Sequence, residues 1–292
     1  MVIMASFFSA SRWPSAINQF IAFHDRGGLA LECHPMTKKR HWFFDPWKYQ
    51  VRTGIVPEYA DGHVIRTHSH PWHQLVYASR GVMTVRTPEG AWVVPIHRGV
   101  WVPAYTRHSI QMSGLVSLRT LYIVPNLCTG LPDRCRAIAI SPLLRELILR
   151  MVELNSLSTR IPAHAHLVSV LIDHLQAMES EAIHLPLPRD RRAKRIATLL
   201  QGEPSDPRSL GELSRIAGAS KRTLERLFKS ETGLGFGKWR QQLRLGQALR
   251  LLAAGEAVTS AALDVGYDST SAFISAFRMT FGKTPGRYFH SA

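Results

Sequence analysis

The 292-residue sequence has few cysteines and no long apolar run. Its three cysteines, Cys33, Cys128 and Cys135, are odd in number and form no CxxC pair. Such sparse cysteine excludes a disulfide-built scaffold and favours a reducing compartment. No apolar run approaches the roughly eighteen residues that a membrane span needs. The opening segment MVIMASFFSA also lacks the basic region and cleavage site of a secretory leader. We therefore expect a cytoplasmic protein with no membrane partner.

Acidic residues are also scarce relative to basic ones. The sequence has 36 Lys and Arg residues against 21 Asp and Glu residues, which gives a formal net charge of +15. Residues 189–292 alone carry 18 basic and 9 acidic side chains, a net charge of +9. A basic excess concentrated on one third of a chain is typical of nucleic-acid binding. The length favours an organisation in about two domains.

The C-terminal third contains one short pattern twice. SLGELSRIAGASKRTLERLFKSETG begins at Ser209, and TSAALDVGYDSTSAFISAFRMTFG begins at Thr259. Each copy predicts a short helix, a glycine-marked turn and a second helix, which is the helix-turn-helix pattern. The amphipathic stretch 236–254 would hold the two units roughly 28 Å apart, near the length of one duplex turn. A helical bundle without a ligand is disfavoured by the duplication and the charge together.

Side-chain spacing separates the inner and outer faces of the second helix in each unit. Leu224 and Phe228 in one copy, and Phe273 and Phe277 in the other, follow helical spacing and should face inward. A serine stands at each expected N-cap. Polar residues expected on the outer faces of these helices, together with the caps, give the candidate DNA contacts. They are Ser220, Lys221, Arg222, Thr223, Arg226, Ser269, Thr270, Ser271, Ser275 and Arg278.

Residues 189–290 resemble the AraC/XylS family of bacterial transcription regulators. The resemblance rests on glycine, aromatic and Thr-Pro positions that agree together, and it is densest in the second unit. The matching residues there are Gly266, Tyr267, Ser269, Ser271, Phe273, Phe277, Phe281, Gly282, Thr284 and Pro285. The resemblance implies double-stranded DNA as a partner and activation through contact with RNA polymerase, with repression left open.

The same resemblance implies which side chains face bases. In the first unit these are Arg222, Thr223 and Arg226, and in the second they are Thr270, Ser271 and Ser275. The second set has no long polar side chain, so it is expected to rely on backbone and shape contacts. The first unit is expected to specify sequence and the second chiefly to anchor.

The sequence of residues 51–128 predicts many short strands. Seven or eight alternating or β-branched runs, broken by Gly and Pro, follow one another from Thr53 to Pro125. The PEG segment at 88–90 indicates a hairpin. Many short antiparallel strands predict a small β-barrel or jelly roll. The expected fold class is α+β: this barrel, then helices, then an all-α double helix-turn-helix.

Five residues of the predicted barrel form a candidate effector site. His68 and His70 alternate along a predicted strand and so share a face, with Gln74 shortly after them. The later segment PAYTRH adds Tyr105 and His108. The spacing resembles the two motifs of the cupin fold, in which an HxH pair and a later histidine converge inside the barrel. It departs from the cupin pattern at Gln74, where cupin enzymes have glutamate, and at Tyr105, where glycine is expected.

Three interpretations of these residues stay open. His68, His70 and His108 could hold a divalent transition metal, line a pocket for a small-molecule effector together with Gln74 and Tyr105, or make core hydrogen bonds. An alternative from another class is a metal-dependent cupin enzyme, an oxygenase or isomerase, that carries a DNA-binding module. The missing carboxylate argues against catalysis, and we expect no enzyme and no cofactor beyond such a metal.

The rest of the chain completes the expected organisation. Residues 1–50 form an N-terminal arm with no assigned role. Residues 129–183 hold two amphipathic helices, which would either form a two-fold homodimer contact or cover the barrel. The first begins at Ser141 and Pro142, and its apolar stripe is Leu143, Leu144, Leu147, Ile148, Met151 and Val152. The second begins at Pro162, and its apolar stripe is Leu167, Val168, Leu171, Leu175 and Met178. The segment HLPLPRD at 184–190 is a proline-rich linker. Residues 191–292 are the expected DNA-binding domain, with its helix-turn-helix units at 209–231 and 259–281.

Overall fold

The computed structural model describes residues 49–55, 58–177 and 184–290. All the elements below belong to one unit of the chain, Trp47–Ala292. The expected N-terminal arm therefore lies outside the described residues, apart from its last two, and so does Cys33. The other two cysteines, Cys128 and Cys135, are buried and free.

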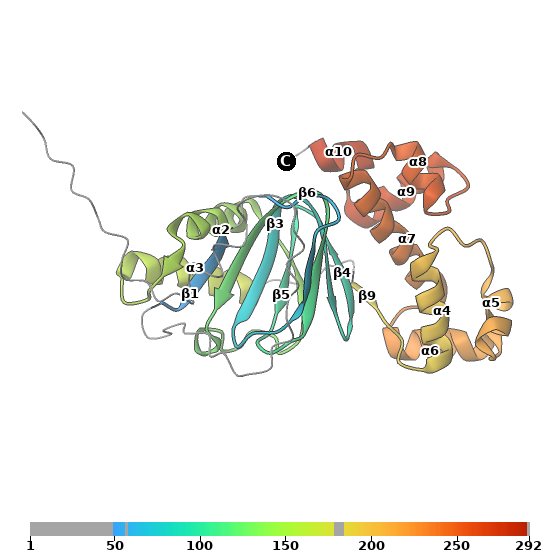
Figure 1. Ribbon diagram of the computed structural model, residues 1–292, viewed down its shortest axis with the longest axis horizontal. Helices are drawn as coiled ribbons and strands as arrows, with labels where there is room; N and C mark the ends of the chain where they lie inside the picture. The colour runs from blue at the N-terminus through green and yellow to red at the C-terminus, as the bar shows by residue number, and fades with distance from the viewer. Residues whose placement is uncertain (1–48, 56–57, 178–183, 291–292) are drawn as a thin grey trace, which may run out of the picture. The chain divides into compact units, whose positions relative to one another are not determined.

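A nine-stranded antiparallel sheet forms the first half of the described chain (Figure 1). Its path runs β7-β5-β3-β6-β1-β8, with β2 paired to β6, and with β4 paired to both β3 and β9. The prediction of many antiparallel strands is confirmed. The strands are β1 (Val51–Ile55), β2 (Val64–His68), β3 (His73–Thr87), β4 (Gly90–Val94), β5 (Arg98–Val102), β6 (His108–Ile123), β7 (Arg136–Ala139), β8 (Ser156–Leu157) and β9 (His184–Pro186).

Two of the strands are longer than the sequence predicted. Strands β3 and β6 span 15 and 16 residues, and each replaces two expected short strands. Gly81 and Gly114 interrupt the apolar pattern where the strands bend, with positive φ angles of 79° and 71°. Glycine tolerates this conformation because it has no Cβ. The predicted hairpin at 88–90 is confirmed as the turn between β3 and β4.

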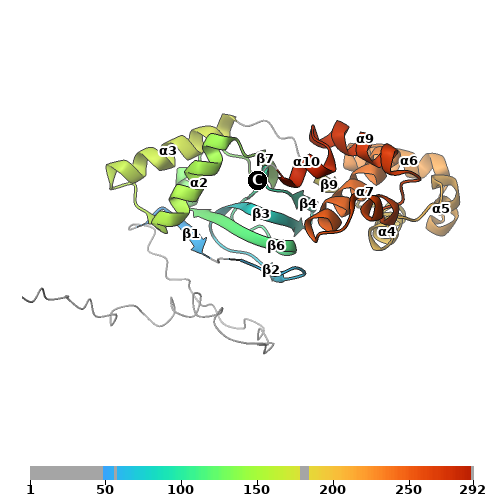
Figure 2. The ribbon, with the colours of Figure 1, turned by 90° about the horizontal axis from the view of Figure 1, so that it is seen from above.

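Strand β3 contributes to two hydrophobic cores, since its successive side chains point to opposite faces of the sheet and both faces are covered. Leu75 and Tyr77 join the core that helices α2 (Pro142–Leu154) and α3 (Pro162–Ala177) cover. Val76 and Met83 belong to a second core, enclosed by the sheet itself. Burial of both faces accounts for the continuous apolar run at 75–78 of this strand. Figure 2 shows α2 and α3 side by side.

Helix α2 begins as predicted at Ser141, whose hydroxyl accepts a hydrogen bond from the Leu144 amide, and Pro142 occupies the first turn. Leu144, Ile148 and Met151 are buried on its inner face. The predicted stripe is wrong at Leu143, which is 60% exposed because it points away from the sheet. On α3, the predicted apolar positions Val168, Leu171 and Leu175 are buried and Leu167 is partly buried, whereas Met178 lies outside the described residues.

Part of the expected linker is a strand. His184 to Pro186 form β9, which pairs with β4. The imidazole of His184 stacks on Trp92 with ring centroids 4.4 Å apart. The indole nitrogen of Trp239 donates a hydrogen bond of 2.7 Å to the Pro186 carbonyl. The first three residues of the segment are therefore held by the sheet rather than extended freely in solvent.

Seven helices make up the second half of the described chain, and the α+β fold class is confirmed. Figure 1 shows α7 linking the group α4–α6 to the group α8–α10. In the described residues, no helix combines the length and the hydropathy needed to cross a membrane. The helices are α4 (Arg191–Gly202), α5 (Leu210–Ala217), α6 (Lys221–Thr232), α7 (Phe236–Ala253), α8 (Val258–Asp264), α9 (Thr270–Phe281) and α10 (Pro285–His290).

Candidate DNA-binding and effector sites

The first helix-turn-helix unit, which we call the first head, consists of α5 and α6. Helix α5 begins with a reciprocal capping box between Ser209 and Glu212, which satisfies two otherwise unpaired amides. It ends at Gly218, whose φ of 65° lies in the left-handed region. Ser220 then caps α6 by accepting a hydrogen bond from the Thr223 amide, as predicted. These local signals fix the angle at which α6 leaves the turn.

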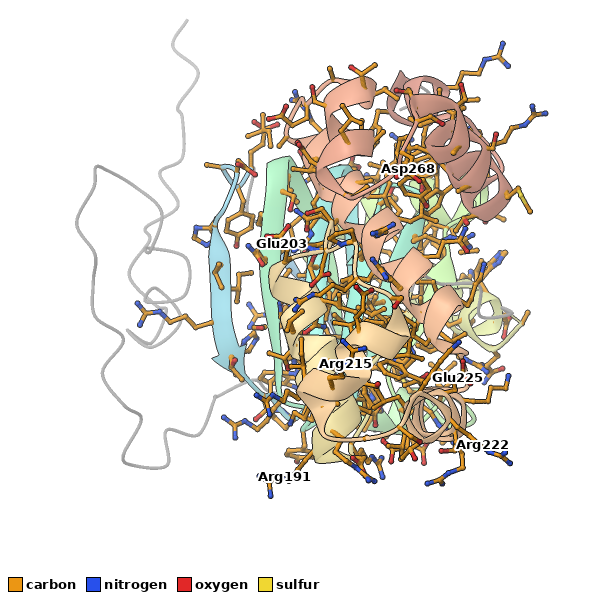
Figure 3. The ribbon with its side chains drawn as sticks, turned by 90° about the vertical axis from the view of Figure 1, so that its right-hand side faces the viewer. Arg191, Glu203, Arg215, Arg222, Glu225 and Asp268 are labelled. Atoms are coloured by element: carbon orange, nitrogen blue, oxygen red, sulfur yellow. The ribbon has the colours of Figure 1, made fainter. Side chains whose placement is uncertain are left out.

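The outer face of α6 is basic and open to solvent. Lys221, Arg222 and Arg226 are exposed, whereas Leu224 and Phe228 are fully buried on the opposite face. Figure 3 shows Arg222 at the outer edge of this half of the chain, extending away from the helices. Thr223 is half-buried, and its hydroxyl lies 2.9 Å from the hydroxyl of Ser220. Two of the predicted contact residues, Ser220 and Thr223, therefore form the N-cap. The three exposed cations can still contact DNA.

The second head consists of α8 and α9. Ser269 caps α9 by accepting from the Ala272 amide, and Gly266 takes a φ of 85° before it. Phe273 and Phe277 are fully buried. Among the predicted contacts, Thr270 is half-buried, and the exposed ones are Ser269, Ser271, Ser275 and Arg278.

Two exposed residues of α6 and α9 were not among the predicted DNA contacts. Glu225 lies on the outer face of α6, and its carboxylate is 3.9 Å from the Lys221 ammonium. Met279 on α9 is 89% exposed, a high value for a large apolar side chain. Helical spacing of four from Lys221 and from Ser275 was the signal that could have identified both. A carboxylate can accept from cytosine, and an apolar side chain can contact the thymine methyl group.

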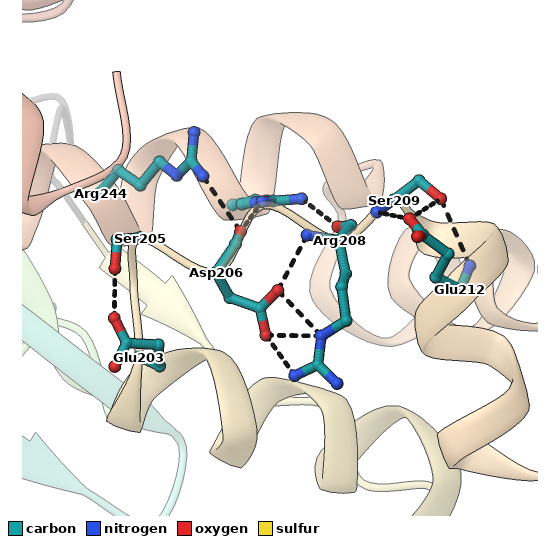
Figure 4. Close-up of polar contacts among 8 residues, drawn as sticks. Glu203, Ser205, Asp206, Arg208, Ser209, Glu212 and Arg244 are labelled. Atoms are coloured by element: carbon teal, nitrogen blue, oxygen red, sulfur yellow. Dashed lines mark hydrogen bonds and ion pairs between the residues drawn. The ribbon is translucent and has the colours of Figure 1, made fainter. Parts of the chain in front are cut away.

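Arg240 and Arg244 of α7 donate hydrogen bonds to backbone carbonyls of the loop before α5, as Figure 4 shows for Arg244 and Asp206. Arg244 donates to the carbonyl of Pro204 at 3.0 Å, before the first head, and to that of Gly266 at 2.7 Å, in the second. It also donates to the Asp206 carbonyl at 3.3 Å. Arg240 bonds the same loop, at the carbonyls of Asp206 and Arg208. The bonds of Arg244 reach both the loop before α5 and the second head, whereas those of Arg240 reach only that loop.

In the first half of the chain, the three predicted histidines meet. The ring centroids are 4.3 Å apart for His68 and His108, 5.2 Å for His70 and His108, and 5.8 Å for His68 and His70. The reason predicted for His70 is wrong, because β2 ends at His68. His70 instead reaches the site from the turn after β2. His68 pairs directly with His108 across β2 and β6.

Each imidazole is anchored through its Nδ1 atom. A backbone carbonyl two residues away in the chain lies 2.8 Å from Nδ1 in His68 and His70, and 2.9 Å in His108. Burial lowers the pKa of His70, and it lowers the pKa of His108 to about 4. Both rings are therefore neutral at neutral pH.

Gln74 and Tyr105, the other two predicted effector contacts, lie in different environments. Gln74 is buried, and its Oε1 lies 3.1 Å from His70 Nε2. The Tyr105 side chain is 74% exposed and does not join the buried cluster. Its amide donates to the His70 carbonyl at 2.8 Å, and its φ is 63°. The backbone thus adopts the left-handed conformation that favours the glycine expected at this position, although the residue is tyrosine.

Comparison with known proteins places both halves in one family. Residues 54–171 match the AraC-like ligand binding domain, and residues 213–291 match a helix-turn-helix domain. The HTH-type transcriptional regulator NimR of Escherichia coli (strain K12) is 37% identical over 221 residues, which cover 76% of this chain and 81% of NimR.

Two further relatives match over smaller shares of this chain. The HTH-type transcriptional regulator RipA of Corynebacterium glutamicum is 40% identical over 103 residues, or 35% of this chain and 31% of RipA. A solved AraC-type regulator from Chromobacterium violaceum shares 29% identity over 34% of this chain and 90% of its own, with a TM-score of 0.33. The matches to NimR and to both domains show that this chain belongs to the AraC family of transcriptional regulators, with a DNA-binding helix-turn-helix domain and an AraC-like ligand-binding domain.

Proposed function

We propose that the chain is a sequence-specific transcriptional activator that reads bases chiefly with α6. The observation that carries this proposal is the exposed row of Lys221, Arg222 and Arg226 on a helix whose frame is fixed by caps and a buried core. A guanidinium can make two hydrogen bonds to one guanine, which discriminates it from the other bases. Ser271, Ser275 and Arg278 of α9 supply shorter contacts and one phosphate contact. Activation proceeds through contact with RNA polymerase, in the cytoplasm.

An effector bound in the first half controls this activity. The effector site comprises His68, His70, Gln74 and His108, with Tyr105 at its edge. Ligand occupancy acts only through different affinities for two states of the protein, because equal binding to both states shifts nothing. His70→Ala is expected to alter the response to the effector and to leave effector-free DNA affinity unchanged. General loss of folding in this variant would favour a purely structural role.

A homodimer is supported by apolar side chains that α2 and α3 leave uncovered. Leu143 on α2 is 60% exposed, and Val170 on α3 is 40% exposed. A two-fold contact between copies could bury both. Light scattering on the wild type and on Leu143→Arg tests this, with a shift to monomer expected for the variant.

The DNA-binding proposal is tested by genome-wide footprinting, followed by affinity measurements on the operator and on random duplexes. Arg226→Ala should weaken operator binding by about 1 to 3 kcal/mol and random binding much less, because base contacts carry sequence discrimination. Arg150→Ala on α2 removes the same charge from an exposed position in the other half and should change neither affinity. Equal losses on both duplexes would reduce Arg226 to a phosphate contact. Turnover of a small molecule independent of DNA would favour the enzyme alternative.

A further inference from the structure

We infer that the histidine cluster binds a divalent transition-metal ion of the cobalt-to-zinc group, with His68, His70 and His108 as ligands and Gln74 as the fourth. This inference rests on the proposed function, since it names the chemical class of the effector at the proposed site. The three imidazoles offer ligand nitrogens that all lie within 4.8 Å of one another. With ring centroids only 4.3 to 5.8 Å apart, the space between them fits an ion better than an organic molecule.

Hydrogen bonding sets the same tautomer on all three rings. Each Nδ1 lies 2.8 to 2.9 Å from a backbone carbonyl, and a carbonyl can only accept. In its neutral form, each ring therefore carries its proton on Nδ1 and keeps a lone pair on Nε2. A carbonyl behind Nδ1 is also the support that orients metal-bound histidines and makes them more basic ligands. The cluster thus presents three prepared nitrogen donors.

A separate hydrogen-bond chain aims the oxygen of Gln74. The hydroxyl of Thr120 donates to the Leu75 carbonyl at 3.1 Å and accepts from Gln74 Nε2 at 2.8 Å. This leaves Gln74 Oε1 facing His70 Nε2 at 3.1 Å. Both facing atoms hold lone pairs and repel each other unless a cation lies beside both. Two ligands about 2.1 Å from one ion lie roughly 3.0 to 3.4 Å apart, which agrees with this separation.

His108 gives independent support. Its side chain is 1% exposed, and its Nε2 makes no hydrogen bond within the described residues. A buried acceptor without a donor is destabilising, and a bound cation would offset that cost.

The donor set selects the class of ion. Imidazole favours the later first-row transition metals, whereas magnesium and calcium prefer oxygen ligands. The described cluster contains no carboxylate, so the ion keeps its full charge and exchanges more readily than from a charged site. Exchange on changing metal supply is what a sensor needs.

The test is metal titration of tag-free, full-length protein after removal of metal by a chelator. Calorimetry should give one Zn²⁺ or Co²⁺ per chain and no binding of Mg²⁺, and Co²⁺ should give a tetrahedral visible spectrum. His108→Ala should weaken affinity at least 100-fold, and the exposed His166→Ala, the matched control, should not change it. Gln74→Glu should bind more tightly, a gain that misfolding cannot produce.

Operator affinity, measured on the same samples with and without Zn²⁺, separates this inference from the proposed function. Absence of transition-metal binding, equal binding by His108→Ala, or binding without any change in operator affinity would each overturn the inference and leave DNA binding standing. Metal binding in a protein that recognises no DNA sequence would overturn the proposed function instead.

A second inference comes from α7. The geometry assigns Arg244 as a positioning residue that sets the spacing of the two DNA half-sites. Its three guanidinium nitrogens bond carbonyls of the loop that leads into the first head, at Pro204 and Asp206, and of the second head, at Gly266. Gly266 also lies so close to this loop that a Cβ on it would come within 2.8 Å of the Cα of Ser205.

A planar guanidinium that holds three carbonyls fixes an angle as well as a distance, which a lysine ammonium cannot reproduce. The two heads are then rigid with respect to each other, and only one separation between half-sites allows both reading helices to enter the major groove. Arg240, which bonds only the loop before α5 and nothing in the second head, offers a matched control on the same helix.

The test uses operators with zero or one base pair inserted between the half-sites. Wild type should lose at least tenfold in affinity on insertion, and Arg240→Lys should behave alike. Arg244→Lys should lose less than threefold while binding an isolated first half-site as wild type does. An unchanged spacing penalty in Arg244→Lys, or loss of binding to the isolated half-site, would overturn the assignment.

Discussion

Helices α6 and α9 share a structural frame, by which we mean the N-cap, the terminal glycine and the buried aromatic side chain. They differ in the side chains that they expose. Each begins at a serine N-cap, ends at a left-handed glycine and buries a phenylalanine at its centre. Outside, α6 exposes Arg222 and Arg226, whereas α9 exposes Ser271 and Ser275. Guanidinium groups reach base edges and bond them in pairs, whereas serine hydroxyls reach less far and make single bonds.

The difference separates what folding requires from what recognition requires. Caps, turn glycines and core aromatics satisfy backbone groups and bury apolar area, so both copies need them equally. Folding does not depend on the exposed outer positions in this way, and at these positions the two heads differ. We therefore assign sequence reading chiefly to the first head and anchoring chiefly to the second.

The largest expected effect tests the shared frame. Phe228→Ala and Phe277→Ala each remove a fully buried ring, and each should lower the free energy of unfolding by about 3 to 5 kcal/mol. Denaturant unfolding of both variants measures this. A small loss for one ring alone would mean that the two frames are not equivalent.

The next prediction contrasts the heads with the sheet half, where the described buried histidines lie. Burial lowers the pKa of His184 to about 4, whereas the unfolded chain binds a proton near 6.5. The unfolded state therefore takes up protons first, and the free energy of unfolding should fall as the pH drops from about 6.5 to about 4. The stability from this histidine is fully present above that window.

Unfolding measured across this range should show a shallower pH dependence in His184→Gln than in wild type. His108, whose pKa is lowered to a similar value, will keep part of the dependence. The exposed His166→Gln serves as the control and should follow the wild-type curve. An identical slope in His184→Gln and wild type would contradict the burial argument.

A smaller effect distinguishes the two reading faces directly. Arg226→Ala should reduce discrimination between operator and random DNA by about 1 to 3 kcal/mol, whereas Ser275→Ala should reduce it by less than about 1 kcal/mol. Arg278→Ala should weaken both duplexes alike and lower the slope of log affinity against log salt by about one. Competition binding at several salt concentrations measures all three. Larger discrimination loss in Ser275→Ala would reverse the roles of the heads.

The smallest effect concerns the turns. A Cβ on Gly218 would meet nothing within 4 Å. Gly218→Ala should therefore lower the free energy of unfolding only through the strain of its left-handed φ, by about 1 kcal/mol. A Cβ on Gly266 would lie 2.7 Å from Arg244 and 2.8 Å from Ser205, so Gly266→Ala should cost more. Thermal unfolding of both variants checks the order. Equal costs would argue against the close contact between Gly266 and the loop before α5.

The frame of each head could be predicted because its signals are local. Ser220, Ser269 and the buried phenylalanines follow from spacing within a dozen residues. The long strands could not, because Gly81 and Gly114 mark bends within a strand with the same residue type that ends one. The sequence correctly predicted that His70 lies near His68 and His108. The predicted reason, alternation along one strand, is wrong, because His70 lies in the turn after β2. The carbonyls behind the imidazoles and around Arg244 leave no trace in side-chain identity, so sequence alone could not reveal them.

The central claim is that the first head reads sequence and the second anchors. It is tested most directly by measuring affinity for an operator series in which every base pair is substituted in turn. Substitutions in the half-site under α6 should each cost about 1 to 3 kcal/mol, and those under α9 should cost markedly less, with the α6 pattern lost in Arg226→Ala. Equal costs in both half-sites, or a larger cost under α9, would contradict the account.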